Sequence, residues 1–277
     1  MKINENVITS RQNEIVKWAA GLSEKKGREE SRAFLAEGVK LTEEAALSRL
    51  HVTHIFLSRA RAELLLPKIK AWFADELYRD LLVVMLSEEA FAKVSTEKSP
   101  EGVICVIKYL DFFEDLDIIN KEDINKVENE RILALSSVRD PSNLGAILRS
   151  ALAFGTQRIL LSADCADPFS PRTVRAAMGS LFRVKLTRVS DLGAAVSALR
   201  ASGRRVFAAE LREGASSLSE MSLLSSDVFI IGNEGHGIDA RISSLCDRSV
   251  YIPISHATES LNASVAAGIL MWEQSKL

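Results

Sequence analysis

The sequence is poor in the features that mark fibrous, membrane and secreted proteins. Its 14 glycines and 6 prolines exclude a collagen-like or proline-rich fibre. The apolar run Leu81–Leu86 is far shorter than the roughly 18 residues of a membrane-spanning helix. The first residues, rich in Lys, Asn and Glu, contain no apolar signal-peptide segment. We therefore expect a globular, cytoplasmic protein without a membrane partner.

Cysteine and histidine are also scarce, and neither is arranged as a metal site. The three cysteines, Cys105, Cys165 and Cys246, are far apart and odd in number. Such cysteines predict reduced, buried thiols of a cytoplasmic protein rather than a disulfide framework. His51 and His54 are three residues apart but have no third ligand near them, so we predict no bound metal.

The remaining composition is that of an ordinary globular chain, with 47% hydrophobic and 26% charged residues. A length of 277 residues fits two domains. The net charge of −2 is unevenly distributed, because residues 111–131 alone contain 8 acidic and 3 basic residues. We interpret this stretch as an acidic linker between a first domain, residues 1–110, and a second domain, residues 132–277.

Both domains alternate helical and extended patterns, which predicts the α/β fold class. In the first domain, apolar spacing predicts helices over residues 9–20, 38–50 and 62–73, and strands over residues 54–57, 81–86 and 102–108. In the second, we predict helices over residues 191–203 and 260–273, and strands over residues 132–138, 158–162, 205–209, 228–231 and 250–254. This alternation indicates a mainly parallel sheet, whose ligands bind in the loops that follow the strands.

The first of three polar loops in the second domain is Arg139–Gly145. It follows a predicted strand and leads into a helix that contains Arg149. Small residues beside Arg149 would let a ligand or another chain approach closely. Taken alone, the segment is better explained as a plain strand–turn–helix junction with a surface arginine than as a binding loop, because such junctions are common in this fold class.

The second loop, Gly232–Gly237, contains three glycines and Glu234 directly after a strand. Glycine permits positive φ and a close approach of the backbone to a ligand. The spacing differs from that of dinucleotide and P-loop motifs, and Glu234 would repel a pyrophosphate. A tight structural turn would also explain the glycines.

The third loop joins a strand that ends near Pro253 to a helix that begins near Ser260 or Asn262. Both of these side chains are good helix caps, and capping alone would explain them. His256 has no partner at catalytic or ligand spacing, so we interpret it as a solvated side chain.

Taken together, the loops resemble the motifs of one family, the SpoU/TrmH RNA ribose 2′-O-methyltransferases of the SPOUT class. Arg139–Ala151 (RDPSNLGAILRSA) is similar to the first motif, Ile230–Ile238 (IIGNEGHGI) to the second and Ile252–Gly268 (IPISHATESLNASVAAG) to the third. Gly179–Lys185 resembles a segment between the first two. Lys25–Leu41 resembles the family's substrate-binding domain, which is similar to a ribosomal-protein RNA-binding fold.

The resemblance implies a fold, a cofactor and an assembly. It implies a C-terminal SPOUT α/β domain with a trefoil knot and a small N-terminal α/β domain that binds RNA. It also implies a homodimer formed through the C-terminal domain. S-adenosylmethionine would bind in the knot, against backbone groups of Gly232, Ile252 and Leu261.

The resemblance also assigns roles to side chains. Methyl transfer to a ribose hydroxyl requires alignment of the attack and removal of the hydroxyl proton. The residue that matches Arg149 has this second task in the family, next to the RNA phosphate. Because arginine normally stays protonated, Arg149 could instead stabilise the alkoxide. Asn143 would orient Arg149, Glu234 would hold the site, and Ser260 and Asn262 would shape the cofactor pocket and the dimer contact.

Ribosomal RNA is the expected substrate, because two-domain family members act on large-subunit ribosomal RNA and tRNA-specific members tend to have shorter N-terminal extensions. The alternatives are a tRNA methyltransferase and a non-catalytic RNA-binding or ribosome-assembly protein of the same fold. A dehydrogenase is opposed by the lack of a dinucleotide motif. Lys25, Lys26, Arg28 and Arg32 could follow RNA phosphates or form a solvated helix end.

Overall fold

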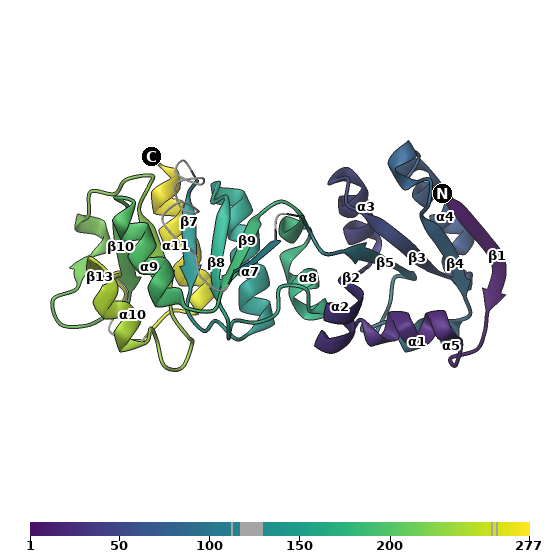
Figure 1. Cartoon of the computed structure of the whole chain (residues 1–277), viewed down its shortest axis with the longest axis horizontal. Helices are drawn as coiled ribbons and strands as arrows, with labels where there is room; N and C mark the ends of the chain where they lie inside the picture. The colour runs from purple at the N-terminus through teal and green to yellow at the C-terminus, as the bar shows by residue number, and fades with distance from the viewer. Residues whose placement is uncertain (112, 117–129, 256, 259) are drawn as a thin grey trace. The chain divides into compact units, whose positions relative to one another are not determined.

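The chain forms two compact units in the computed structural model (Figure 1). Unit 1 comprises Met1–Leu110 and Asp167–Arg183, and unit 2 comprises Asp111–Ala166 and Val184–Leu277. Contacts thus assign residues 167–183, which we expected in the second domain, to unit 1. The structure describes residues 1–111, 113–116, 130–255, 257–258 and 260–277.

Unit 1 is built on a five-stranded mixed sheet. Its strands are β1 (Lys2–Ile8), β2 (Ala33–Glu37), β3 (Val52–Ser58), β4 (Leu82–Leu86) and β5 (Val103–Lys108). They are arranged in the order β1-β4-β3-β5-β2, and β5 is antiparallel to both of its neighbours. The predicted helices and strands of this unit are present, whereas β1 and β2 were not predicted as separate strands.

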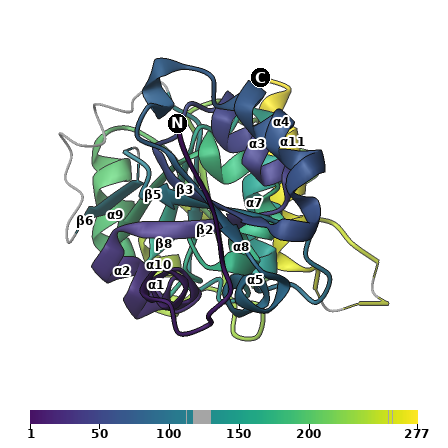
Figure 2. The same cartoon turned by 90° about the vertical axis from the view of Figure 1, so that its right-hand side faces the viewer.

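Helices cover both faces of this sheet, with α3 and α4 on one side and α1 and α5 on the other (Figure 2). The helices of unit 1 are α1 (Glu14–Gly21), α2 (Lys25–Ser31), α3 (Val39–Leu47), α4 (Ala62–Trp72), α5 (Glu88–Val94) and α8 (Pro171–Ala177). Alternate residues of β5 serve the two faces: Ile104 and Val106 pack with α1 and α5, while Cys105 contacts Thr42 of α3. Burial raises the pKa of Cys105 to about 12, as expected of an inert buried thiol.

Side-chain caps fix where the helices of unit 1 begin. Ser87 accepts a hydrogen bond from the backbone N–H of Ala90 and caps α5, as its position before two glutamates predicts. The helix expected from residue 9 begins instead at Glu14, because the side chain of Asn13 accepts from the N–H of Ile15.

The segment 167–183 is joined to the rest of unit 1 by a buried ion pair. The Arg28 guanidinium donates to Oδ2 of Asp167 over 2.5 and 3.1 Å, and to the carbonyl oxygens of Leu22 and Ser23 over 3.0 and 2.6 Å. Arg28 is only 3% exposed. Aromatic rings pack in the same place, with Phe169 stacked 4.3 Å from Tyr109.

The burial of Arg28 corrects one interpretation of the basic cluster before Phe34. A guanidinium that is buried and paired within the fold is not available to an RNA phosphate. Lys25 and Lys26 are exposed and form ion pairs with Glu29 and Glu30 along α2. The cluster is therefore mainly a solvated helix end rather than a phosphate track.

We expect Asp167→Asn to destabilise unit 1 by about 3–5 kcal/mol, because the substitution leaves the buried Arg28 guanidinium without its counter-charge. Urea denaturation followed by circular dichroism measures this change. Glu29→Gln is the matched control: its ion pair with Lys25 is exposed, and its loss should cost about 0.5 kcal/mol or less. Equal losses for the two variants would show that the buried pair has no special role.

Unit 2 contains an eight-stranded sheet in which all neighbouring strands are parallel. Its strands are β6 (Phe113–Leu116), β7 (Ile132–Leu135), β8 (Arg158–Ser162), β9 (Lys185–Val189), β10 (Val206–Ala209), β11 (Ser216–Ser217), β12 (Val228–Ile231) and β13 (Arg248–Tyr251). The order is β11-β13-β10-β12-β7-β8-β9-β6. The α/β class and the parallel sheet are confirmed.

Two pairs of helices cover the two faces of this sheet (Figure 1). The helices are α7 (Pro141–Phe154), α9 (Leu192–Ala201), α10 (Ala240–Leu245) and α11 (Ala263–Ser275). α9 and α10 pack on the apolar residues of β7, β10 and β12, while α7 and α11 lie side by side on the other face. Among the described residues, no helix is long and apolar enough to cross a membrane.

Part of the predicted linker belongs to this sheet. Residues Phe113–Leu116 form β6, which pairs with β9, and residues 117–129 lie outside the described residues. The buried Arg158 of β8 donates to Glu114 of β6 over 2.6 Å and to Glu130 over 2.7 Å. Two of the acidic residues of the predicted linker are thus neutralised inside unit 2.

Candidate active site

The three predicted loops follow β7, β12 and β13. Since all strands of unit 2 are parallel, their carboxyl ends lie on one edge of the sheet. β12 is the direct neighbour of β7, and β10 separates β12 from β13. This order alone brings the first two loops together.

The first loop leads into α7 through a side-chain cap. Asp140 is the capping residue, and its carboxylate accepts from the N–H groups of Ser142 and Asn143. Pro141 fits the first helical position because it has no N–H to leave unpaired. Asn143 is therefore not needed as a cap, and its side chain is available to the site.

The side chains of Glu234, Asn143 and Asn262 form a directed chain of hydrogen bonds across the three loops. Asn143 Nδ2 donates to Glu234 Oε1 over 2.7 Å, and Asn262 Nδ2 donates to Asn143 Oδ1 over 3.0 Å. Asn262 Oδ1 accepts from the N–H of Ser264 and so caps α11. Each amide is oriented by its neighbour, so these hydrogen bonds fix the three loops relative to one another.

The second loop is closed by its own backbone. Asn233 and Gly237 exchange two backbone hydrogen bonds of 2.8 and 3.0 Å, and Gly237 has a φ of +70°. A Cβ on Gly232 would lie 2.4 Å from the Gly237 carbonyl carbon, closer than any side chain allows. Gly232 is therefore required by the close approach of the loop to itself.

Sequence reasoning missed Asn233, which organises this loop. Its Oδ1 accepts from the N–H groups of Gly235 and His236 over 2.9 and 3.1 Å, and its Nδ2 donates to the Ser137 carbonyl over 2.8 Å. An asparagine that precedes a glycine by two residues is a signal for such a turn, because its side chain can accept from the backbone two residues on. Asn233 thus fastens the loop that carries Glu234 to the end of β7.

The predicted cofactor contacts Gly232, Ile252 and Leu261 lie in loop backbone after β12, after β13 and before α11. The predicted strand 250–254 ends at Tyr251, which leaves Ile252 in the loop. Within the described residues, the backbone groups of these three residues take part in none of the turn and loop hydrogen bonds. Free N–H and C=O groups of this kind suit an adenosine and an amino-acid moiety, so the residues present fit S-adenosylmethionine.

Ser260 lies in the same loop but apart from the hydrogen-bond chain. Its side chain is exposed, and its carbonyl oxygen accepts from Thr258 Oγ1 over 3.2 Å. Asn262, not Ser260, opens the helix α11. His256 lies outside the described residues.

Arg149 is exposed on α7 and has no partner. Within the described part of unit 2, every other lysine and arginine makes a hydrogen bond, an ion pair or a ring contact, whereas Arg149 makes none. It follows Asn143 by six residues, which places the two side chains about 120° apart around the helix. The structure therefore unites Asn143, Glu234 and Asn262 but shows no contact between them and Arg149.

A second polar cluster, missed by sequence reasoning, surrounds Asp164 after β8. Partial burial alone would raise the pKa of Asp164, but hydrogen bonds from Ser137, Ser162 and Arg139 outweigh it and lower the pKa to about 2. Asp164 therefore stays ionised at neutral pH. In the described part of the chain, no group of His, Cys, Asp or Glu could hold a metal ion.

The depressed pKa of Asp164 makes part of the stability pH-dependent. The stabilisation is complete above the ordinary pKa of 3.8 and is lost as the pH falls toward 2. Because the side chain is 45% exposed, solvent screening reduces the effect to about 1 kcal/mol. We expect the difference in unfolding free energy between wild type and Asp164→Asn to shrink by this amount between pH 4 and pH 2 in urea titrations. A difference that stays constant would contradict the pKa shift.

Comparison with known proteins agrees with this geometry. The model of the SpoU rRNA Methylase family matches residues 130–272, more than half of the chain, including all three loops. The chain belongs to this family. A second model, the MRM3-like substrate binding domain, matches residues 13–105 within unit 1.

Full-length relatives support the SpoU assignment. The chain is 33% identical to the 23S rRNA (guanosine(2553)-2'-O)-methyltransferase RlmP of Bacillus subtilis, over 96% of this chain and 97% of that protein. It is 28% identical to the 23S rRNA (uridine(2479)-2'-O)-methyltransferase of Streptomyces viridochromogenes, over 96% and 90%. The structure of an AdoMet-bound rRNA methyltransferase from Sinorhizobium meliloti superposes with a TM-score of 0.82 at 30% identity, over 99% and 98%.

The predictions of family, enzyme class and cofactor are confirmed by this membership. The SpoU chain is an RNA 2′-O-ribose methyltransferase that uses S-adenosylmethionine, and unit 1 contains its substrate-binding domain. The two alternatives outside this class, a dehydrogenase and a non-catalytic protein of the same fold, are not needed to explain the site.

Proposed function

We propose that this SpoU enzyme methylates a ribose 2′-hydroxyl of 23S ribosomal RNA in the cytoplasm, with Arg149 as the residue that meets the reacting nucleotide. The observation that carries the proposal is the unpartnered Arg149 in a unit whose other described basic side chains are all engaged. The names of the full-length relatives support 23S rRNA over tRNA. A tRNA substrate remains the second candidate.

When bound, S-adenosylmethionine supplies an activated methyl group on a sulfonium. The backbone of Gly232, Ile252 and Leu261 would hold it at the carboxyl ends of β12 and β13. The trefoil knot that the family resemblance implies would enclose this cofactor site. The strand order supports a knot, because the earlier strand β10 lies between β12 and β13 in the sheet. The chain must therefore cross β10 on its way from β12 to β13.

Arg149 would bind the RNA phosphate and stabilise negative charge on the attacking oxygen. A guanidinium offers several N–H donors in a fixed fork and remains protonated, which suits a phosphate and an alkoxide better than it suits proton removal. Glu234, Asn143 and Asn262 would keep the loops in register, and Ser260 would shape the cofactor pocket.

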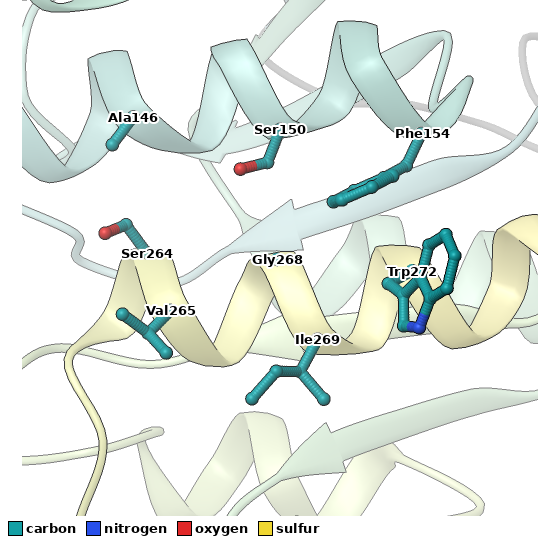
Figure 3. A pocket seen from close by; sticks show the side chains of 8 residues that line it. All are labelled: Ala146, Ser150, Phe154, Ser264, Val265, Gly268, Ile269 and Trp272. Carbon is teal, nitrogen blue, oxygen red and sulfur yellow. The ribbon is translucent and has the colours of Figure 1, made fainter.

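A homodimer would bring Arg149 to a partner's loops. α7 and α11 leave a groove of about 450 Å³ whose lining includes Ala146, Ser150, Phe154, Val265 and Trp272 (Figure 3). Val265 and Trp272 are each about half exposed and line the same groove, so a second copy seated there would cover apolar surface. Arg149 is adjacent to Ser150 in the sequence, so a second copy seated here would meet it.

The proposal is tested with purified protein, methyl-labelled S-adenosylmethionine and 23S rRNA or tRNA transcripts. We expect label in 23S rRNA, at one ribose that loses its 2′-O-methyl group in cells without the gene. Label in tRNA alone would overturn the choice of substrate. Calorimetry with S-adenosylmethionine on the dimer is the control for a competent cofactor site.

A further inference from the structure

Arg32, which caps the end of α2 in unit 1, differs from the other basic residues of that helix. Arg28 is buried and paired, and Lys25 and Lys26 form ion pairs along α2. Arg32 is exposed, and its guanidinium makes no hydrogen bond or ion pair with any described residue. All of its N–H donors are therefore available to a ligand.

The guanidinium of Arg32 rests on an aromatic ring that is fixed to the core of unit 1. Its central carbon lies over the ring of Tyr109, 4.5 Å from the ring centroid. Tyr109 in turn stacks on Phe169, which is 1% exposed, with 4.3 Å between the two centroids. A guanidinium plane supported in this way is a platform on which an unpaired RNA base can stack.

The backbone also holds Arg32 in this position. Its φ of +47° lies in the left-handed region, where glycine is the usual residue at a helix end and an arginine is strained. The carbonyl oxygen of Arg32 accepts from the N–H of Tyr109 over 2.9 Å. The side chain above the ring and the backbone beside it are thus fixed together.

A second cation without a carboxylate partner lies next to Arg32. Lys108 ends β5 and is paired in the sheet with Ala33, the residue after Arg32. Its Nζ donates to the carbonyl oxygen of Ser31 over 3.1 Å and forms no ion pair with any described residue. An ammonium group has three N–H donors, so two remain for a phosphate.

Two further aromatic rings join this surface through Ser31. Trp18 Nε1 donates to the hydroxyl of Ser31 over 3.1 Å, and the Trp18 ring lies 5.0 Å from that of His54. Burial, together with the charge of Lys108, lowers the pKa of His54, so this ring is uncharged at neutral pH. Aromatic rings beside cations are the combination that binds single-stranded nucleic acid.

We propose that a stacking surface of unit 1 binds a single-stranded segment of the substrate RNA. The surface consists of Trp18, Arg32, His54, Lys108 and Tyr109. One base stacks on the Arg32 guanidinium, and a neighbouring phosphate accepts from Lys108. Duplex RNA is disfavoured, because its bases are already stacked and two cations are too few for a phosphate track. The inference rests on the proposed function, since it takes RNA as the substrate.

The test measures binding of two fluorescently labelled octamers to the full-length protein by anisotropy. One is octauridylate, and the other has the same sugar–phosphate backbone without bases. Both carry the same charge, so a difference between them reports contacts to the bases. Because stacking on a side chain stabilises a bound base, we expect about tenfold tighter binding of octauridylate.

Substitutions assign this difference to the stacking surface. Arg32→Gly suits the positive φ and removes the platform, so the tenfold difference should largely disappear while the fold is kept. Arg32→Lys keeps the charge but not the plane, and should lose the difference as well. Lys108→Met should weaken both octamers about threefold and reduce the log–log salt slope by about 0.7, as expected for one phosphate of a single strand.

Arg49→Gly is the matched control for Arg32→Gly. Arg49 is also an exposed arginine of unit 1 with a positive φ, +53°, but it is paired with Asp75. The substitution relieves the same backbone strain and removes the same charge, and it should leave the binding of both octamers unchanged.

Equal binding of the two octamers by the wild type, or a difference that survives in Arg32→Gly, would overturn the proposal. A hairpin duplex whose binding depended on Arg32 as strongly as that of octauridylate would assign the surface to duplex RNA and would overturn it as well. Methylation assays on the same preparations separate this proposal from the proposed function. A protein that methylates 23S rRNA but does not prefer octauridylate contradicts only the stacking surface. A protein that prefers octauridylate through Arg32 but methylates no RNA contradicts only the proposed function.

Discussion

Arg149→Ala should lower RNA methylation by about 10²–10³-fold while S-adenosylmethionine binds as tightly as to the wild type. The arginine is exposed and makes no contact that stabilises the fold, so the melting temperature should not change. Incorporation of labelled methyl groups into 23S rRNA measures the effect, and calorimetry measures cofactor binding. The lost activity would then reflect weaker stabilisation of the transition state, and not weaker cofactor binding or a less stable fold.

Two further variants test whether the effect depends on the guanidinium of Arg149. Arg149→Lys keeps the charge but loses the fork of N–H donors, so its activity should fall between the wild type and the alanine variant. Arg200→Ala removes another exposed arginine, which is paired with Asp247 outside the site, and should leave methylation nearly unchanged. Undiminished methylation by Arg149→Ala with the cofactor still bound would remove Arg149 from the reaction.

Gly232→Ala is expected to weaken S-adenosylmethionine binding by about 10- to 100-fold. The new Cβ would lie 2.4 Å from the Gly237 carbonyl carbon and 2.7 Å from the Ile238 nitrogen, so the closed loop must open. Forcing an extra methyl group into a packed site costs about 1–3 kcal/mol, and this strain falls on the backbone that we propose holds the cofactor. Calorimetry with S-adenosylmethionine measures the change.

Gly235→Ala is the matched control in the same loop. Its nearest neighbour is Asn233 Oδ1 at 3.5 Å, an ordinary contact, and its φ is not positive. We expect cofactor binding close to that of the wild type. If both glycine variants bound the cofactor normally, the second loop would have no part in holding it.

The sequence allowed the α/β class and the meeting of the three loops to be predicted because both follow from local pattern. Strand–helix alternation requires a parallel sheet, and a parallel sheet places its carboxyl ends on one edge. Asn143, Glu234 and Asn262 could therefore be expected near one another although they are up to 119 residues apart. The reaction and the cofactor were inferred from the family resemblance, because the hydrophobic periodicity of a sequence carries no information about them.

The features that were missed depend on partners distant in the sequence. Arg28 looks like a surface charge among lysines and glutamates, and nothing local indicates that Asp167 buries it. Asp140 competes with Ser142 and Asn143 for the same capping role, and only geometry decides between them.

The buried pair of Arg28 and Asp167 limits where the chain can be divided to exchange unit 1 between enzymes. A chimera joined within residues 111–131 would carry helices α1–α5 to a new enzyme but would leave behind the segment that supplies Asp167 and Phe169. Its transplanted module would hold an uncompensated cation and an incomplete aromatic stack. Exchange of RNA-binding modules among such enzymes therefore requires three junctions, one within residues 111–131 and one on each side of residues 167–183.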